Sequence, residues 1–490
     1  MIQFNKTETE IPMTFAFAQL GVSLQTQLIT SLACLLLTTF VGASVLTQTA
    51  LGQSDDNAVW IKQMEAINPA INPPFEIDES LVRAAGIQKI SGLHLDLYTD
   101  VRDPSRFKDL PAVFDSSVAQ WCHFFGVPVD KAQAWKLRAF LIADRNNTTR
   151  FQRAGLMPQD LPEFLAGFQK QHNLWFFLQP SEYYTRHLMI HEGTHGFMLW
   201  FLGGYGSPWF SEGTAELLGV HQWQNQRLSL RYRLRDRTEA PYWGRVKRIQ
   251  DEHKSGEAMT LEEVLQIKPT AFLQVRYYAW AWAGCEFFVH HEKSRKQFLE
   301  MISHSKLNSN AFNRKLKTDM RHDWDELARD WELFVAEMEY GYEVARGRIV
   351  DAEPVARQAQ QFKILSNHSW QNTSIKLKQG DKIQISGSGE FVVSSQSKVP
   401  NGVPWNCQSN GITIQYYRGH PLGMLHAGIM NPTLKTAKDQ VAGLLKPIPV
   451  GQSTEFTASQ DGVLCLRINE SPSQLDDNQG GLEVTVKKLE

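Results

Sequence analysis

Two histidines, His191 and His195, stand four residues apart, and Glu192 directly follows the first of them in the run His-Glu-Gly-Thr-His. On a helix, positions i and i+4 share a face, so both imidazoles can bind one metal ion with Glu192 beside it. Glu212, farther along the chain, is a carboxylate that can close the coordination sphere as third ligand. The spacing therefore predicts a Zn²⁺ site with a general base next to the metal.

The residues around this motif predict a buried helix. Arg186 to Leu202 (RHLMIHEGTHGFMLWFL) is rich in apolar side chains. A polar cluster buried in such a helix is costly without partners, and a metal ion supplies them. The alternative is a core cluster satisfied by other side chains. Gly203-Gly204 predicts the end of the helix, and Ser207-Pro208 predicts the start of the next one.

Glu212 and Glu216 stand one turn apart on that next helix. We interpret Glu216 as the carboxylate that accepts a hydrogen bond from the free N–H of a ligand histidine and so fixes its tautomer. The alternative is a solvated helix carboxylate. Three protein ligands leave a fourth position on zinc for water. Zinc would lower the pKa of that water, and Glu192 would accept its proton during attack on a carbonyl carbon and deliver it to the leaving amine.

The motifs HEGTHGF and PWFSEGTAELL resemble those of the gluzincin metallopeptidases, most closely the peptidase MA-like group, which carries HExTH and then P-x-W-x-x-EG-x-AE. Here Trp209 directly follows Pro208, one position off that form, whereas EG-x-AE is intact. The resemblance covers about residues 85–300 and implies an α+β, thermolysin-like fold around the HExxH helix. It implies zinc ligands at His191, His195 and Glu212, the general base at Glu192, and the supporting carboxylate at Glu216.

The same resemblance extends to a later aromatic segment, Arg276 to Trp282, and selects Tyr278 as the donor that stabilises the oxyanion. The alternative is an aromatic helix face packed in the core. In gluzincins the strand before the motif helix often edges the cleft and pairs with extended substrate. That makes Trp175 to Gln179 a candidate peptide-binding edge. The alternative is an interior strand.

The segments upstream of the motif predict a small α+β region. Residues 92–98 and 135–143 alternate or run apolar as strands, and residues 107–125 follow a helical pattern. Asn173 to Leu178 reads as a strand just before the motif helix. The sequence therefore predicts that the metal site lies on the motif helix and that strands of this α+β region pack beside it.

The N-terminal segment has the composition of an export signal. No charged residue occurs from Ile11 to Ser54, and Leu28 to Leu46 is strongly apolar. We predict a signal peptide or an uncleaved membrane anchor at 1–52. The protein is therefore expected to be exported: periplasmic, secreted or anchored by this segment, with no other membrane contact. The net charge of −2 gives no reason to expect a nucleic-acid partner.

A domain boundary falls near residue 350. We predict a zinc metallopeptidase-like domain at 57–350, a polar linker at 351–361 and an all-β domain at 362–490. In that last region short alternating strands are separated by Gly, Asn, Pro and Ser turns, which is typical of an antiparallel sandwich. Cys407 and Cys465 both lie there, and the sequence does not show whether they pair.

This C-terminal region resembles bacterial calcium-dependent galactophilic lectin domains in the run W-x-x-T-x-I-x-L-x-x-GD-x-I-x-I from Trp370 and in LRINESPSQLDDNQGG at 466–481. The resemblance implies glycan binding and a Ca²⁺ site with oxygen ligands. The residues at the ligand positions are Glu470, Gln474 (by its carbonyl), Asp477 and Asn478. The alternative is a polar turn at 476–480. The sequence departs from the pattern at Glu470, where an aspartate is usual, and lacks the sugar-contacting histidine expected near Cys407.

These observations favour an exported zinc-dependent peptidase that acts on peptides or proteins and carries a lectin-like accessory domain. Two alternatives stay open. One is a secreted glycan-binding or scaffold protein whose peptidase-like domain keeps zinc but is inactive. The other is a zinc amide or ester hydrolase that is not a peptidase.

Overall fold

The structure, a computed structural model, describes residues 74–355, 360–394 and 402–489, together with positions 62, 64, 68 and 70–72. The predicted signal or anchor at 1–52 lies outside these residues. Among the helices of the described part, none has the length and apolar character needed to cross a membrane. Helices and several sheets combine to give an α+β protein.

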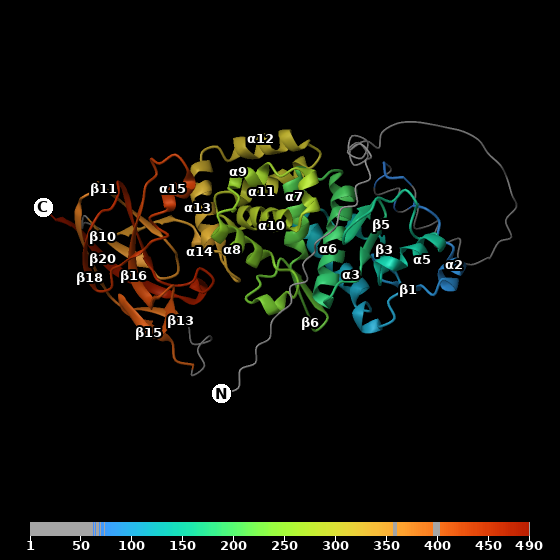
Figure 1. The fold of residues 1–490 in the computed structure, drawn as a ribbon, viewed down its shortest axis with the longest axis horizontal. Helices are drawn as coiled ribbons and strands as arrows, with labels where there is room; N and C mark the ends of the chain where they lie inside the picture. The colour runs from blue at the N-terminus through green and yellow to red at the C-terminus, as the bar shows by residue number, and fades with distance from the viewer. Residues whose placement is uncertain are drawn as a thin grey trace. The chain divides into compact units, whose positions relative to one another are not determined.

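A five-stranded mixed sheet, in which Figure 1 labels β1, β3 and β5, forms the first part of the fold. The strand order is β1-β2-β3-β5-β4. The three central strands are parallel, and the two outer ones are antiparallel to their neighbours. The central strand, LRAFLI, is buried throughout, as expected for a parallel strand covered on both faces. The strands are β1 (Gln88–Ser91), β2 (Leu95–Thr99), β3 (Leu137–Ile142), β4 (Gly167–Lys170) and β5 (Asn173–Phe177).

Alternate residues of the central strands face two different apolar clusters. Tyr98, Phe140 and Trp175 pack with short helices on one face, and their neighbours in sequence pack into the main core on the other. These helices are α2 (Glu79–Ala84) and α5 (Thr148–Arg153), with α3 (Leu110–Phe125) and α4 (Val129–Ala132) on the main-core side. Both faces of the sheet are therefore packed, and the motif helix contacts β4 and β5 on one of them.

The predicted strand at 92–98 begins later than expected, because residues 92–94 form the turn between β1 and β2. The Asp115 carboxylate accepts hydrogen bonds from the backbone N–H groups of Leu93 (2.8 Å) and His94 (2.7 Å) in that turn. The predicted helix at 107–125 likewise starts at Leu110 and ends at Gly126, whose φ of 68° closes it. Strands β3 and β5 confirm the predictions at 135–143 and 173–178.

Helices make up the middle of the chain. The motif helix α6 lies between the sheet and helices α7 and α10 (Figure 1). The helices are α6 (Glu182–Phe197), α7 (Pro208–Gly219), α8 (Arg245–Ser255), α9 (Leu261–Leu265), α10 (Val275–His290), α11 (Arg295–Glu300), α12 (Ser309–Asp319), α13 (Trp324–Ala336) and α14 (Val344–Gly347). A hairpin of β6 (His221–Gln224) and β7 (Arg227–Leu230) follows α7.

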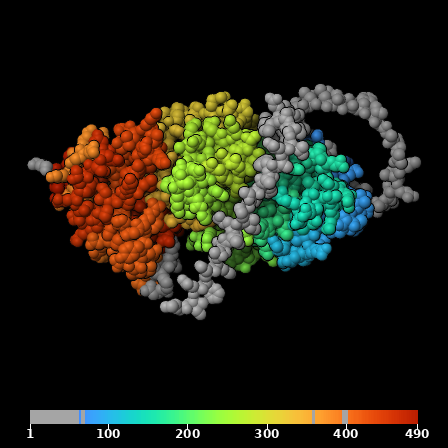
Figure 2. Space-filling model, in the orientation of Figure 1, coloured from blue at the N-terminus to red at the C-terminus, as the bar shows by residue number. Residues whose placement is uncertain are grey.

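Two sheets with a shared apolar core form the C-terminal region, as the alternating pattern predicts; it is coloured orange to red in Figure 2. One sheet contains β9 (Glu353–Pro354), β10 (Gln361–Leu365), β12 (Lys382–Ser388), β13 (Phe391–Ser394), β14 (Trp405–Cys407), β18 (Ser453–Thr457) and β20 (Gln479–Leu489). The other contains β8 (Val350–Asp351), β11 (Gln371–Leu377), β15 (Asn410–Tyr417), β16 (His420–Met430), β17 (Ile448–Pro449) and β19 (Gly462–Ile468). The helix α15 (Ala437–Val441) lies between β16 and β17 in sequence.

The predicted linker at 351–361 needs a correction. Its first residues are strands: β8 pairs with β11, and β9 pairs with β10, so this stretch belongs to the two sheets. Residues 356–359 lie outside the described part. In the described chain Cys407 and Cys465 are both free thiols, so they do not pair.

Candidate metal centre

Three donor atoms form a small triangle between α6 and α7. Nε2 of His191 lies 3.2 Å from Nε2 of His195 and 3.3 Å from Oε2 of Glu212. The third side, from His195 Nε2 to Glu212 Oε2, is 3.4 Å. The predicted zinc ligands are therefore brought together, and this group of one buried histidine, one partly buried histidine and a partly buried glutamate is able to hold one metal ion.

The size of this triangle fits a metal ion. In a tetrahedral zinc site with bonds of about 2.0–2.1 Å, neighbouring donor atoms stand about 3.3–3.4 Å apart. Two imidazole nitrogens and a carboxylate oxygen at that separation leave room for one such ion above their plane. The side chains of His195 and Glu212 are 12% and 23% exposed, so this side of the triangle is in partial contact with solvent.

Close packing of α7 on α10 fixes the Glu212 side of the triangle. A Cβ at Gly213 would stand 2.2 Å from the carbonyl oxygen of Ala281 on α10, so only glycine permits this approach. On the other side, α6 starts at Ser181, whose hydroxyl accepts from Tyr184 N–H, and ends in a π-helical turn, Met198–Leu202. Gly203 closes that turn at a φ of 67°, as the sequence predicts.

The start of α7 differs in one detail from the prediction. Ser207 and Pro208 occupy the first positions of the helix, but the Ser207 hydroxyl makes no capping hydrogen bond. Its Oγ instead lies 2.9 Å from Oγ of Ser309, which begins α12. Ser207 therefore ties the start of α7 to a neighbouring helix.

The outer nitrogens of both ligand histidines have partners. Nδ1 of His191 lies 3.4 Å from Oε1 of Glu216, and Nδ1 of His195 lies 3.3 Å from Oγ of Ser211. A proton on Nδ1 in each ring leaves the Nε2 lone pair directed at the centre of the triangle. Ser211 was not predicted, although it directly precedes Glu212 in the sequence.

Charge distribution in the site follows from burial and from these contacts. Burial alone would lower the pKa of His191, but Glu212 and Glu216 raise it to about 10. Burial alone would raise the pKa of Glu212, but His195 and His191 lower it to about 2. The triangle thus pairs a carboxylate with imidazoles in a way that suits a cation at its centre.

Glu192 lies next to the triangle and outside it. Burial, opposed by His191 and His195, raises the pKa of its carboxyl group. Its side chain rests on the outer strand β4, where a Cβ at Gly167 would stand 2.6 Å from Oε1 of Glu192. A carboxylate with a raised pKa, fixed beside a metal-ligand set, suits a general base.

Glu216 is almost fully buried and is bound by an arginine that no sequence pattern indicated. Arg245, the first residue of α8, donates from Nε to Oε2 of Glu216 (3.0 Å) and from Nη2 to Oε1 (3.1 Å). Burial would raise the pKa of Glu216, but Arg245 and His187 lower it well below its usual range. Glu216 is therefore a buried anion that contacts His191, and not a solvated helix carboxylate.

Replacing Glu216 by alanine is expected to weaken zinc binding by about 10–100-fold without abolishing it, because His191 loses the partner that orients its ring. Competition with a chromophoric chelator measures this change. Glu286→Gln on α10 is a matched control, since that carboxylate pairs with His290 (3.6 Å) away from the site. Equal zinc affinities for the Glu216→Ala protein and the unaltered protein would remove Glu216 from the metal centre.

Two tyrosines border the triangle. The Tyr278 ring, on α10, lies 5.9 Å from the His191 ring, and its hydroxyl has no hydrogen-bond partner among the described residues. Tyr205, which was not predicted, lies 6.0 Å from the His195 ring and donates from its hydroxyl to Oε1 of Gln169 on β4 (3.3 Å). Both phenols are near the reacting region. His290 and His291, the weaker candidates for this donor role in the sequence, have carboxylate partners instead: His291 lies 2.9 Å from Asp330, and His290 lies 3.6 Å from Glu286.

The predicted peptide-binding edge at Trp175 to Gln179 needs a correction. β5 is an interior strand that pairs with β3 on one side and β4 on the other. The outer strand of the sheet is β4, and it is the strand that touches Glu192. The short run Gly-Phe-Gln-Lys shows no alternation that would have indicated this place.

Of the predicted calcium ligands, Glu470 and Asn478 contact each other. Nδ2 of Asn478 donates to Oε2 of Glu470 (2.5 Å) and to the carbonyl oxygen of Ser366 (2.8 Å), and all these groups are buried. Gln474 is exposed, and Asp477 ends a short 3₁₀ turn. In the described chain, no group of three His, Cys, Asp or Glu donors gathers in the sandwich. Calcium and glycan binding stay predictions, and a Ca²⁺ titration would check the first.

Comparisons with known proteins add little. No family model matches the chain, and no curated protein matches it in sequence. A solved structure described as the EclA N-terminal domain, a PllA-like lectin, is a distant match with 20% identity and a TM-score of 0.20. The alignment covers 26% of this chain and 96% of that one.

Proposed function

We propose that the protein is an exported zinc-dependent peptidase of the gluzincin type, with a thermolysin-like arrangement around α6. The observation that carries this proposal is the donor triangle of His191, His195 and Glu212 with Glu192 beside it. Export rests on the apolar N-terminal sequence alone. Zinc is favoured because imidazole and carboxylate ligands in a three-residue set with an open fourth position are typical of catalytic zinc.

The chain's own residues supply the proton chemistry. Glu192 holds the proton released by the attacking water at its carboxylate and delivers it to the leaving amine, a role to which its raised pKa is suited. Glu216 and Ser211 hold the ligand rings in place. Zinc, when bound, would act as a Lewis acid that lowers the pKa of water and polarises the carbonyl.

The outer strand β4 supports a peptide as the substrate. Its far edge is unpaired in the described sheet, so backbone groups from Gly167 to Lys170 are available to an extended chain. A peptide paired there would lie along Glu192, which rests on Gly167. A small amide or ester has no use for such an edge, which is why a peptide is the favoured substrate.

A peptide-library digest with the purified chain tests the proposal, with Glu192→Gln as control. Cleavage products that require Glu192 and added zinc would support a peptidase. Zinc binding without cleavage would favour the inactive scaffold. Turnover of small amides or esters without peptide cleavage would favour the other hydrolase.

Replacing Gly167 by alanine is expected to lower kcat by about 10²-fold while zinc affinity stays unchanged. The new methyl group would stand 2.6 Å from Oε1 and 2.9 Å from Cγ of Glu192, so the carboxylate must move. Steady-state kinetics and a zinc titration measure the two effects. Lys131→Ala, an exposed position on α4 and outside the proposed peptide-binding edge, is the control. Full activity of the Gly167→Ala protein would show that catalysis does not depend on the contact between the Glu192 carboxylate and Gly167.

Replacing Tyr278 by phenylalanine is expected to lower kcat by about 10²–10³-fold with little change in KM, as for loss of an oxyanion donor. Among the described residues its hydroxyl has no hydrogen-bond partner and can donate to substrate, whereas that of Tyr205 is bound to Gln169. Tyr205→Phe is therefore the comparison, with a smaller loss expected. A larger loss from Tyr205→Phe would transfer the donor role to that residue.

A further inference from the structure

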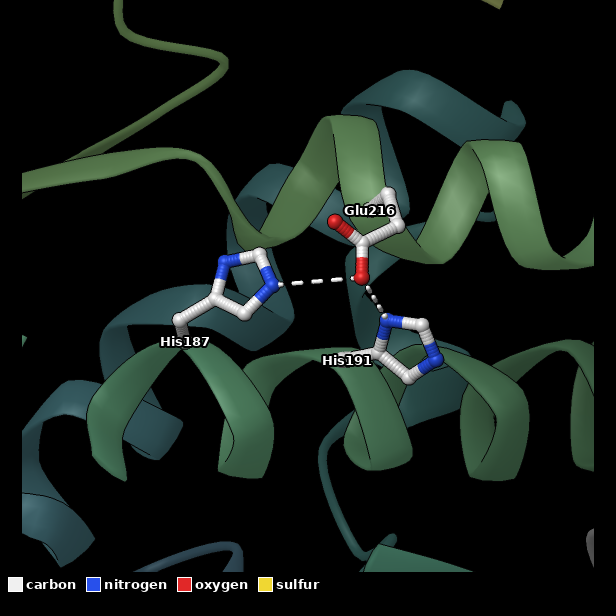
Figure 3. Close-up of side chains that lie close together, drawn as sticks. All are labelled: His187, His191 and Glu216. Carbon is white, nitrogen blue, oxygen red and sulfur yellow. Dashed lines mark ion pairs between the residues drawn. The ribbon is translucent and has the colours of Figure 1, made fainter. Parts of the chain in front are cut away.

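His187 precedes His191 by one helical turn, so three histidines, His187, His191 and His195, follow one face of α6. The His187 side chain is 1% exposed. Its Nε2 lies 3.4 Å from Oε1 of Glu216, and Figure 3 shows that oxygen between the His187 and His191 rings. In the N-terminal half of α6, His187 is thus a second histidine that contacts the same carboxylate oxygen as His191.

The His187 ring is closely confined. It stacks on Tyr184 at 5.5 Å between ring centres. On the opposite helix, a Cβ at Gly219 would stand 2.7 Å from its Cε1 and 2.8 Å from its Nδ1. The glycine at the end of α7 therefore makes room for an imidazole at this depth, and the ring has little freedom to turn away from Glu216.

Oε1 of Glu216 is contacted from three directions. Nη2 of Arg245 lies at 3.1 Å, and the two imidazole nitrogens lie at 3.4 Å each, which are ion-pair contacts longer than an ordinary hydrogen bond. Arg245 also binds Oε2, so alone it would draw the whole carboxylate toward α8. The two histidines of α6 oppose that pull and keep Oε1 within reach of His191 Nδ1.

His187, His191 and Glu216 are also close enough together to hold an ion of their own. The arrangement of Arg245 argues against this use, because its guanidinium already supplies a positive charge to both oxygens of Glu216. A second cation there would meet that charge in a buried site. The inner histidine is therefore better suited to hold the carboxylate than to hold a metal.

We propose that His187 is a positioning residue: through Glu216 it sets the orientation of His191 and thereby the affinity of the centre for zinc. This rests on the proposed zinc centre, but not on peptide cleavage. Nothing in the chemistry requires His187 to touch metal or substrate.

Zinc affinity of the full chain, measured by chelator competition, tests the proposal with three variants. His187→Leu is expected to weaken zinc binding by about 10–100-fold, as for loss of an outer-shell partner. His187→Gln is expected to stay within a few-fold of the unaltered protein, because its amide N–H reaches the position of Nε2. His221→Phe is the matched control: His221 is equally buried and stacks on Tyr183 at 4.5 Å, but its Nδ1 bonds Gly219 O and not Glu216.

Unchanged affinity in His187→Leu, equal losses in His187→Leu and His187→Gln, or an equal loss in His221→Phe would overturn the proposal. So would a zinc content of two per chain that falls to one in His187→Leu, since that result would make His187 a ligand. Thermal unfolding of the metal-free variants separates a folding defect from a weaker site. Because the readout is zinc affinity, a chain that binds zinc without cleaving peptides would refute the peptidase function and leave this test decisive.

Discussion

Glu192→Gln is expected to lower kcat/KM for peptide cleavage by about 10²–10⁴-fold while one zinc per chain is retained. The side chain keeps its shape and its place on β4 beside Gly167, but the amide cannot accept the proton of the attacking water. Glu192 stands outside the triangle of His191, His195 and Glu212, so the ligand set is unchanged. Kinetics on a library-derived peptide and elemental analysis of the same sample measure both effects.

The retained zinc is the control that makes this result informative. A protein that loses both zinc and activity would show that Glu192 supports the ligands, and would not identify the base. Unchanged cleavage with zinc in place would mean that another group accepts the proton. Only the combination of full zinc content and lost turnover assigns the base to Glu192.

Helical spacing made the metal ligands predictable. His191 and His195 share a face because they stand at i and i+4, and Glu212 and Glu216 do so on the next helix for the same reason. Alternating polarity likewise predicted strands of the sandwich such as β12. These features depend on local geometry that a short stretch of sequence contains.

The residues that the sequence did not reveal arrive from distant parts of the chain. Arg245 reaches Glu216 from α8, and its place depends on how α8 packs on α10. The role of Gly167 could not be predicted, because it depends on the order of the strands in the sheet. β4 precedes β5 in sequence, but β5 pairs with β3 and β4 pairs with β5 as the outer strand. His187 did carry a local signal, the third histidine at a spacing of four, which marks it in hindsight.

Glu212→Gln is expected to weaken zinc binding by more than the roughly 10–100-fold that loss of an outer partner costs, and to abolish peptide cleavage at ordinary zinc concentrations. The carboxylate brings negative charge to a site where its oxygen stands 3.3 Å and 3.4 Å from the two imidazole nitrogens. A neutral amide leaves a dication with no anionic ligand in a largely buried place.

Chelator competition on Glu212→Gln, Glu216→Ala and the unaltered protein decides which carboxylate is the ligand. Glu286→Gln again serves as the control, because its side chain is 21% exposed, close to the 23% of Glu212, and lies on α10. If the outer triangle holds the metal, Glu212→Gln loses the most affinity. If Glu212→Gln keeps zinc and Glu216→Ala loses it, the ion is bound by His187, His191 and Glu216 instead. The partial exposure of Glu212 and the guanidinium on Glu216 both favour the first result.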